Sequence, residues 1–319
     1  MPVWYSPDVN AAPSAHSASP SALARFAWGL VWYTVLIILW GAWVRISHSG
    51  DGCGDHWPLC NGEAIPVGGP AKTWIEVSHR YSTALYGLLV VGLLVAARRA
   101  FGSGHPARFW ALATLVFTIT EALIGRQLVT LGLVDQSSNP LRLLVMPLHL
   151  VNTSALLVST VMAAESISFP AASRLPLSPG LRRVVLLSSA TLLVVLCTGA
   201  IAALGSHLAP SASLTSGLAK DLAADSHSAV RLRLLHPFLG LSLAILGPWA
   251  LASWSRHVVG ERARLWSRRV RYVLFTAIFV GAATLLFLAP VWLKLTHLLL
   301  ANVLVIVGAV AFFHASRSQ

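Results

Sequence analysis

Charged residues are scarce in this chain. Of its 319 residues only 11% are Asp, Glu, Lys or Arg, whereas 56% are hydrophobic and the mean hydropathy is +0.71. A soluble domain carries about 25% charged residues, so the composition excludes a soluble globular protein. Apolar runs of about 20 residues recur instead, which is the length that crosses about 30 Å of hydrocarbon. The sequence therefore predicts an all-α integral membrane protein.

Acidic residues are the scarcest charges, with 11 against 23 Lys and Arg and a net charge of +12. The cations cluster after the second, fourth and sixth apolar runs: Arg98, Arg99, Arg108, Arg174, Arg182, Arg183, Arg256, Arg262, Arg264, Arg268, Arg269 and Arg271. The positive-inside rule places these segments and both termini in the cytoplasm. We therefore expect a multi-pass protein of the cell (inner) membrane with lipid around it and no nucleic-acid partner.

The apolar runs predict eight transmembrane helices, at residues 24–44, 75–97, 109–131, 143–164, 183–204, 231–254, 271–289 and 291–313. The last four resemble the first four, which predicts two pseudo-symmetric four-helix bundles related by an axis along the membrane normal. The expected organisation is a disordered cytoplasmic tail (1–22), a first half (23–166), a cytoplasmic linker (167–182) and a second half (183–314).

Each even-numbered span carries one histidine about five or six residues from its outer end: His79, His149, His236 and His297. At roughly 1.5 Å per residue all four lie about 7–9 Å below the outer boundary, in one layer. Ionisable residues inside a membrane are costly and by default functional. The pairs His79 with His149 and His236 with His297 suit two haem irons. Hydrogen-bonded packing is the alternative. Zinc or copper is disfavoured, because the second half offers few further ligands.

Other polar residues lie near this layer. Glu76 precedes His79 by three positions on the same helix face, so it is a candidate proton acceptor or partner of the ligand, or an interfacial solvated acid. Arg45 and Arg126 lie at the height expected for haem propionates, which guanidinium groups bind, unless they snorkel to the interface. Glu121 lies deeper, and we expect it to pair with a neighbouring polar group.

Cysteine is also rare. Cys53 and Cys60 lie in one outer loop with six residues between them. The space outside the cytoplasm is oxidising, so we expect a disulfide. A structural staple and a redox-active pair remain equally open. Cys197, in the fifth span, is expected to be a small buried apolar residue.

Several rare elements then occur in a fixed order: Gly41-Ala-Trp-Val-Arg45-Ile-Ser-His-Ser49-Gly50, then Cys53, then Trp57-Pro-Leu-Cys60-Asn-Gly62, then Trp74-Ile-Glu76-Val-Ser-His79-Arg80. In these segments, and over about residues 30–313, the chain resembles the haem A synthase family. The stretch from Ile124-Gly125 to Gly132-Leu133 is similar to the third span of that family. Arg126-Gln127 departs from the small residues usual there, and Glu121 stands where many members have an amide.

The resemblance implies a reaction, the oxidation of the C8 methyl of haem O to the formyl group of haem A for terminal oxidases. It implies that His79 and His149 hold the substrate haem O, and that His236 and His297 hold a haem B cofactor. Glu76 would assist the chemistry. A haem O synthase and an electron acceptor are the implied partners.

Two other classes compete with this interpretation. A di-haem b-type electron carrier would also pair histidines, but transmembrane electron transfer stacks haems across the bilayer, whereas both sites here lie in one leaflet. A haem exporter or chaperone without chemistry is the third class. The cysteine loop and Glu76 occur only in the first half, which favours chemistry there.

Overall fold

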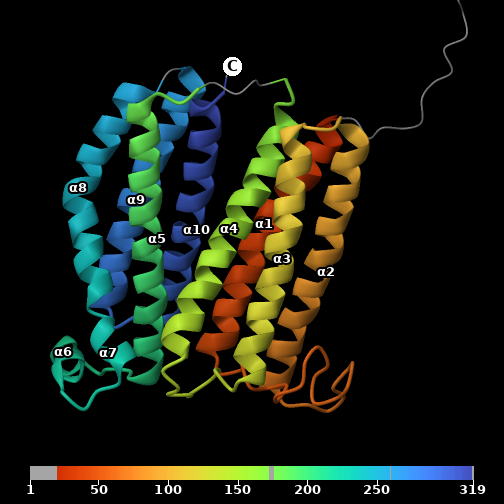
Figure 1. Cartoon of the computed structure of the whole chain (residues 1–319). Coiled ribbons are helices and arrows are strands. Elements are labelled where there is room, and N and C mark those ends of the chain that lie inside the picture. The colour runs from red at the N-terminus through yellow and green to blue at the C-terminus, as the bar shows by residue number, and fades with distance from the viewer. Residues whose placement is uncertain (1–19, 172–175, 259, 318–319) are drawn as a thin grey trace, which may run out of the picture.

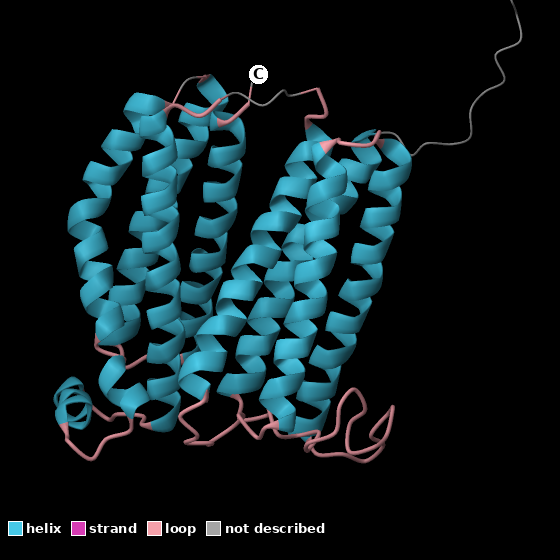
Figure 2. Cartoon of the chain, in the orientation of Figure 1, coloured by secondary structure: helices cyan, strands magenta, loops and turns pink. Residues whose placement is uncertain are grey.

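The computed structural model describes residues 20–171, 176–258 and 260–317. Most of the expected tail (1–22) and residues 172–175 of the expected linker lie outside the described residues. In the described part the regular structure is helical throughout (Figure 2), and 8 helices are long and apolar enough to cross a membrane. The predicted all-α architecture with eight spans is therefore confirmed.

The helices form two groups that stand side by side (Figure 1). The first group contains α1 (Pro20–Ile46), α2 (Ala71–Ala100), α3 (Pro106–Thr130) and α4 (Arg142–Ser168). The second group contains α5 (Pro179–Leu208), α8 (Leu235–His257), α9 (Glu261–Leu286) and α10 (Val291–Ala315). Two short helices, α6 (Leu214–Leu222) and α7 (Ser228–Leu232), join α5 to α8.

Two span boundaries differ from the sequence prediction. The seventh span was expected at 271–289, but α9 begins at Glu261, so the arginines from Arg262 to Arg271 belong to its first turns rather than to a loop. Arginine is a good helix former, and its long side chain carries the charge away from the apolar layer. The expected sixth span (231–254) is divided, because α7 ends at Leu232 and α8 begins at Leu235.

The tight reversal between α9 and α10 lies where the sequence predicts a hinge. Leu288 and Ala289 have φ values of 58° and 57°, and the Ala289 N–H donates to the Thr284 carbonyl at 2.7 Å. Pro290 then caps α10 with φ at −61°. Proline has φ fixed near this value and cannot donate a hydrogen bond, so it suits the start of a helix.

The main apolar core lies inside the first group and extends across to α10. Val31 of α1, Leu93 of α2 and Leu157 of α4 are all fully buried, and Val310 of α10 joins the same cluster. Half of the apolar window of α10 is buried (50%), whereas that of α5 is 0% buried. The second group attaches to the first through α10, which packs on α4 and α1, and through α5, which also packs on α4.

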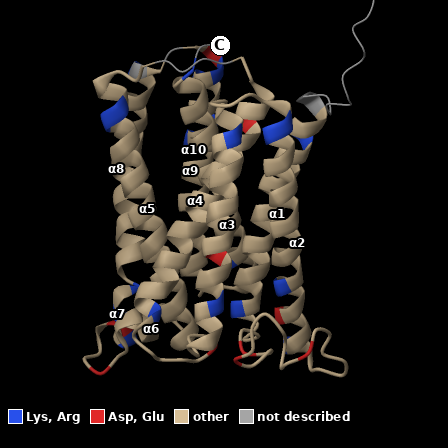
Figure 3. Cartoon of the chain, turned by 45° about the vertical axis from the view of Figure 1, so that its right-hand side comes forward, with Lys and Arg blue, Asp and Glu red and all other residues tan. Residues whose placement is uncertain are grey.

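The two ends of the molecule differ in charge. We call the end with residues 47–70, 131–141 and 209–227 the disulfide end, and the end with residues 98–108, 169–183 and 256–271 the arginine end. Figure 3 shows most acidic residues at the disulfide end, both beside α6 and α7 and in the loops below α1 and α2, and bands of basic residues at the other end.

Candidate metal centres

The four candidate ligands lie at a common depth from the disulfide end. They follow the first residues of their spans (Ala71, Arg142, Ser228 and Val291) by 8, 7, 8 and 6 positions: His79, His149, His236 and His297. At roughly 1.5 Å per residue, each histidine lies about 9–12 Å along its span from that first residue. The layer is slightly deeper than predicted, because the helices begin earlier than the apolar runs do.

Glycines make room for three of these rings. A Cβ atom placed at the glycine would lie 3.1, 3.0 and 2.8 Å from Cε1 of the histidine in the pairs Gly41 with His79, Gly199 with His236, and Gly281 with His297. Real Cβ atoms almost never approach a neighbour below 3.0 Å. In each case the glycine belongs to the neighbouring helix, so the absence of a side chain there fixes where the ring lies.

The second group brings its two histidines together. The ring centres of His236 and His297 are 6.0 Å apart, with an interplanar angle of 67°. An imidazole nitrogen binds a first-row metal at about 2 Å, so two opposed bonds and two half-rings span roughly 6 Å. Nδ1 of His236 contacts the Val195 carbonyl at 3.1 Å, which leaves Nε2 as the ligand atom. These residues therefore fit a haem held by two histidines.

In the first group Glu76 is buried, with 4% of its surface exposed. Its Oε2 accepts the Cys53 backbone N–H at 2.8 Å, and its Oε1 accepts from Nη2 of Arg80 at 2.5 Å. Arg80 also donates to the carbonyls of His56 and Leu59, at 2.7 Å each. Glu76 is thus not a solvated interfacial acid, and it joins α2 to the loop above it.

That loop contains the expected disulfide between Cys53 and Cys60, and both residues are buried. They pack against Val77, one residue after Glu76. Cys197 is only half-buried, not buried as predicted, because the apolar window of α5 contains no buried residue.

The two arginines predicted to bind propionates differ in their exposure in the structure. Arg45 is half-buried, whereas Arg126 is exposed on α3. Sequence analysis missed Arg142, which is 2% exposed and donates to the Asp135 carbonyl at 3.0 Å. Arg45 lies near enough to Arg142 and to Lys294 for charge repulsion. Among the described residues no salt bridge joins these cations to an acid, so their surroundings favour an anion.

A polar junction links the two groups at the disulfide end. Nδ1 of His48 lies 2.9 Å from Asp135 Oδ1, and Nε2 of His207 lies 3.2 Å from the Asp135 carbonyl. The two imidazole rings stack with centres 4.3 Å apart. Desolvation raises the pKa of Asp135, but hydrogen bonds from His48 and the Gln136 N–H outweigh it and hold that pKa below its usual value. Arg45 and Arg142 lie beside this cluster, and their charge disfavours a metal cation.

The second group has its own ion pair at the matching place. Arg233 precedes His236 by three positions, as Glu76 precedes His79. Its Nε donates to Oδ1 of Asp221, on α6, at 2.5 Å. It also donates to the Ala209 and Gly217 carbonyls. The sequence signal for this pair was present in the repeat, since a charged residue stands at the same spacing from the histidine in both halves.

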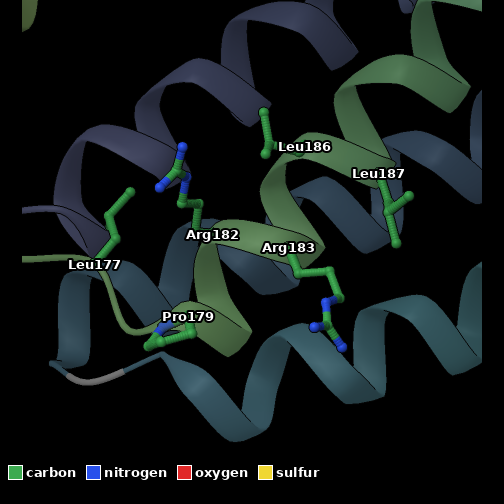
Figure 4. A pocket seen from close by; sticks show the side chains of 6 residues that line it. All are labelled: Leu177, Pro179, Arg182, Arg183, Leu186 and Leu187. Carbon is green, nitrogen blue, oxygen red and sulfur yellow. The ribbon is translucent and has the colours of Figure 1, made fainter.

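The best-defined surface pocket lies far from the histidine layer. It has a volume of about 420 Å³ at the arginine end, where α5 begins (Figure 4), and is lined by Leu177, Pro179, Arg182, Arg183, Leu186 and Leu187. It contains no histidine, cysteine or carboxylate. We therefore do not treat it as part of the candidate centres.

Comparison with known proteins agrees with this arrangement. The chain is 37% identical over 281 residues to a protein named protoheme IX farnesyltransferase from Thermus thermophilus, a match that covers 88% of this chain and 46% of that protein. It is 37% identical over 184 residues to a heme A synthase from Symbiobacterium thermophilum, covering 55% of this chain and 57% of that one. A heme A synthase from Exiguobacterium sibiricum is 33% identical over 147 residues, covering 45% and 47%.

The chain spans about half the length of the curated relatives it matches. The match to the family model is longer, since residues 24–308 fit the COX15-CtaA family, described as cytochrome oxidase assembly protein. That range includes all four histidines, Glu76 and the disulfide loop. The chain therefore belongs to the COX15-CtaA family of cytochrome oxidase assembly proteins.

Proposed function

We propose that this protein is a haem A synthase, which oxidises the C8 methyl group of haem O to the formyl group of haem A. One observation carries the proposal: the molecule has two similar histidine pairs but a buried carboxylate, Glu76, beside only one of them. Two equivalent electron-transfer sites would not need that difference. Relatives named heme A synthase support the same activity.

The two pairs have different occupants in this proposal. His79 and His149 hold the substrate haem O, and His236 and His297 hold haem B. When bound, the haem irons supply the oxidation–reduction chemistry. The protein residues fix ring positions, bind the propionates and move protons. The cations Arg45, Arg142 and Lys294 are the propionate partners we favour, because guanidinium and ammonium groups bind carboxylates strongly when partly buried. Arg126 remains a candidate on the exposed side of α3.

Glu76 is the proposed proton acceptor. Counted with water as the oxygen source, a methyl group becomes a formyl group by gaining one oxygen atom and releasing four protons and four electrons. The electrons pass to an acceptor outside this chain, and the protons need a local base. Arg80 and the Cys53 N–H hold both carboxylate oxygens of Glu76 in place. A base held in a fixed position typically contributes about 10²–10⁴-fold to the rate.

We also infer the orientation and the supplier of the substrate. The arginine end faces the cytoplasm under the positive-inside rule, so both haem sites lie toward the outer leaflet of the cell membrane. A relative named protoheme IX farnesyltransferase matches over only 46% of its length. An enzyme of that name attaches a farnesyl group to haem, which is the feature that haem O carries, so a haem O synthase is the partner we expect.

Haem extraction after supplying haem O and an artificial electron acceptor to purified protein tests the activity. Formyl-haem should appear with the wild-type chain, whereas Glu76→Gln should accumulate haem O or a hydroxylated intermediate with haem B content intact. Glu63→Gln removes the same charge from an exposed loop position and should behave like the wild type. An absence of formyl-haem in the wild type, with both haems bound, would instead support an electron carrier.

Labelling tests the orientation. In a Cys197→Ser background, Ser103→Cys at the arginine end should react only with a reagent on the cytoplasmic side. Ala224→Cys at the disulfide end should react only from outside. Both positions are exposed. The reverse pattern would invert the topology and move both haem sites to the inner leaflet.

A further inference from the structure

Three of the four histidines meet a neighbouring helix in the same way, and the fourth does not. The ring of His236 packs on Gly199, and its Nδ1 contacts the carbonyl of Val195, four residues earlier on α5. The ring of His297 packs on Gly281, and the carbonyl of Ala277, again four residues earlier, faces it. In the second group the backbone group that faces each ring from the neighbouring helix is therefore a neutral carbonyl, which contacts Nδ1 in the case of His236.

His149 has a carboxylate at this place. Gly125 on α3 matches Gly281, but a Cβ atom there would have no neighbour within 4 Å, so the His149 ring does not rest on it. The residue four positions before Gly125 is Glu121. Its Oε1 lies 3.4 Å from Nδ1 of His149. Nδ1 is buried and forms no hydrogen bond among the described residues, so the 3.4 Å contact is an ion-pair distance rather than a formed hydrogen bond.

A network on α3 and α4 holds Glu121 in this position. Nδ2 of Asn152 donates to Glu121 Oε2 at 2.6 Å, and the hydroxyl of Thr153 contacts Oε1. Thr120 donates to Oδ1 of Asn152 at 2.6 Å, which fixes the orientation of that amide. Groups on two helices therefore hold the Glu121 carboxylate beside His149.

We propose that Glu121 is a positioning residue for His149. It accepts the Nδ1 hydrogen, leaves Nε2 as the nitrogen that binds iron, and makes His149 the most electron-donating of the four ligands. A charged acceptor forms a hydrogen bond roughly twice as strong as a neutral one, and such partners raise the basicity of a metal-bound imidazole. A more basic ligand stabilises ferric over ferrous iron. The haem of the first group then has the lower reduction potential.

This inference rests on the proposed binding of haem by His149, and its test uses the second haem as an internal control. Redox titration of the protein loaded with haem B and haem O should resolve two potentials. In Glu121→Gln the lower potential should shift upward, while the potential of the His236–His297 site stays unchanged. Asn152→Leu, which releases Glu121, should shift the same potential in the same direction by less. Glu63→Gln should move neither.

A second measurement needs no haem. In protein labelled with ¹⁵N-histidine, His149 should carry its hydrogen on Nδ1 in the wild type and lose that preference in Glu121→Gln. Unchanged potentials and an unchanged tautomer in Glu121→Gln, with both haems bound, would overturn the role of Glu121 but leave the proposed function intact. A wild type that binds no haem through His149 would contradict the proposed function, and the tautomer would still decide whether Glu121 orients the ring.

Discussion

The two halves use the same scaffold with different residues at the decisive positions. In the first half a buried carboxylate, Glu76, stands three residues before the histidine of α2. In the second half Arg233 stands at the same spacing before the histidine of α8. Glu76 binds the Cys53 N–H of the disulfide loop and Arg80, whereas Arg233 binds Asp221 on α6. The comparison teaches that the repeat supplies two histidine pairs, and that a difference at one position decides which pair has a buried carboxylate three residues before one of its histidines.

The halves also differ in how polar their interiors are. The first half contains linked side-chain hydrogen bonds, such as Thr34 to Tyr86 and Thr120 to Asn152. In the second half the apolar window of α5 contains no buried residue, and the best-buried helix is α10, which packs against α9 and against the first half. Satisfied polar networks hold helices in one arrangement. We therefore expect the first half to be the more rigid bundle and the second to depend on its contacts with α4 and on its ligand.

The largest expected effect is the loss of one haem without the other. His297→Ala should remove the haem of the second half, because one imidazole cannot replace two in a low-spin site, and His79→Ala should remove only the haem of the first half. Pyridine haemochrome spectra of the purified variants measure the haem retained. His56→Ala, in the exposed loop, should keep both. If either ligand variant loses both haems, the two sites are not independent.

Next in size is the effect of filling the glycine positions. Gly281→Ala should weaken haem binding in the second half by about tenfold or more, because overpacking costs about 1–3 kcal/mol and displaces the His297 ring. Gly199→Ala and Gly41→Ala should follow in that order, as the clash distances lengthen from 2.8 to 3.0 and 3.1 Å. Gly125→Ala has open space and should leave haem content unchanged or raise stability slightly. An equal loss of haem binding in Gly281→Ala and Gly125→Ala would contradict the view that the missing side chain at Gly281 makes room for the His297 ring.

An effect confined to one loop, rather than to a haem site, is expected where an ion pair or a disulfide holds the loop of each half in place. Arg233→Met should release residues 209–227, because breaking a buried ion pair costs about 3–5 kcal/mol. The double variant Cys53→Ser with Cys60→Ser should loosen residues 47–70 by about 2–3 kcal/mol. Hydrogen exchange of each loop reads these effects separately, with the exposed Arg231→Met as control. Release of both loops by one variant would mean that the halves share one folding unit at this end.

The smallest effect concerns the junction between the halves. Asp135 has a lowered pKa, so its contribution to stability is present above the ordinary value of about 3.9 and is lost as the pH falls through its lower folded value. Asp135→Asn should cost less than about 1 kcal/mol at pH 7, since the pair is partly exposed, and less still at pH 3. Thermal unfolding in detergent at both pH values measures this. A larger loss of stability in Asp135→Asn at pH 3 than at pH 7 would mean that folding raises the pKa of Asp135 rather than lowering it.

The sequence by itself determined the eight spans and the histidine layer. Twenty apolar residues must bury their backbone polar groups as a helix in lipid, so hydropathy alone is enough to place a span. It also placed the hinge before Pro290 and the loop disulfide, because proline chemistry and a short cysteine spacing are local properties. It missed α6 and α7, which are too short and too polar to stand out, and it began α9 late because arginines interrupt the apolar pattern.

Only the tertiary structure decided which polar groups meet. The sequence does not name the partners of Glu76, Glu121 and Arg142. In the structure Glu76 accepts a loop N–H, Glu121 lies beside His149, and Arg142 is buried where the halves join. His48 and His207, far apart in the chain, stack on each other. These contacts depend on how helices from separate parts of the chain pack against one another. The glycines that make room for the histidine rings leave no periodic signal, because the sequence shows where a side chain is missing but not which ring occupies the space.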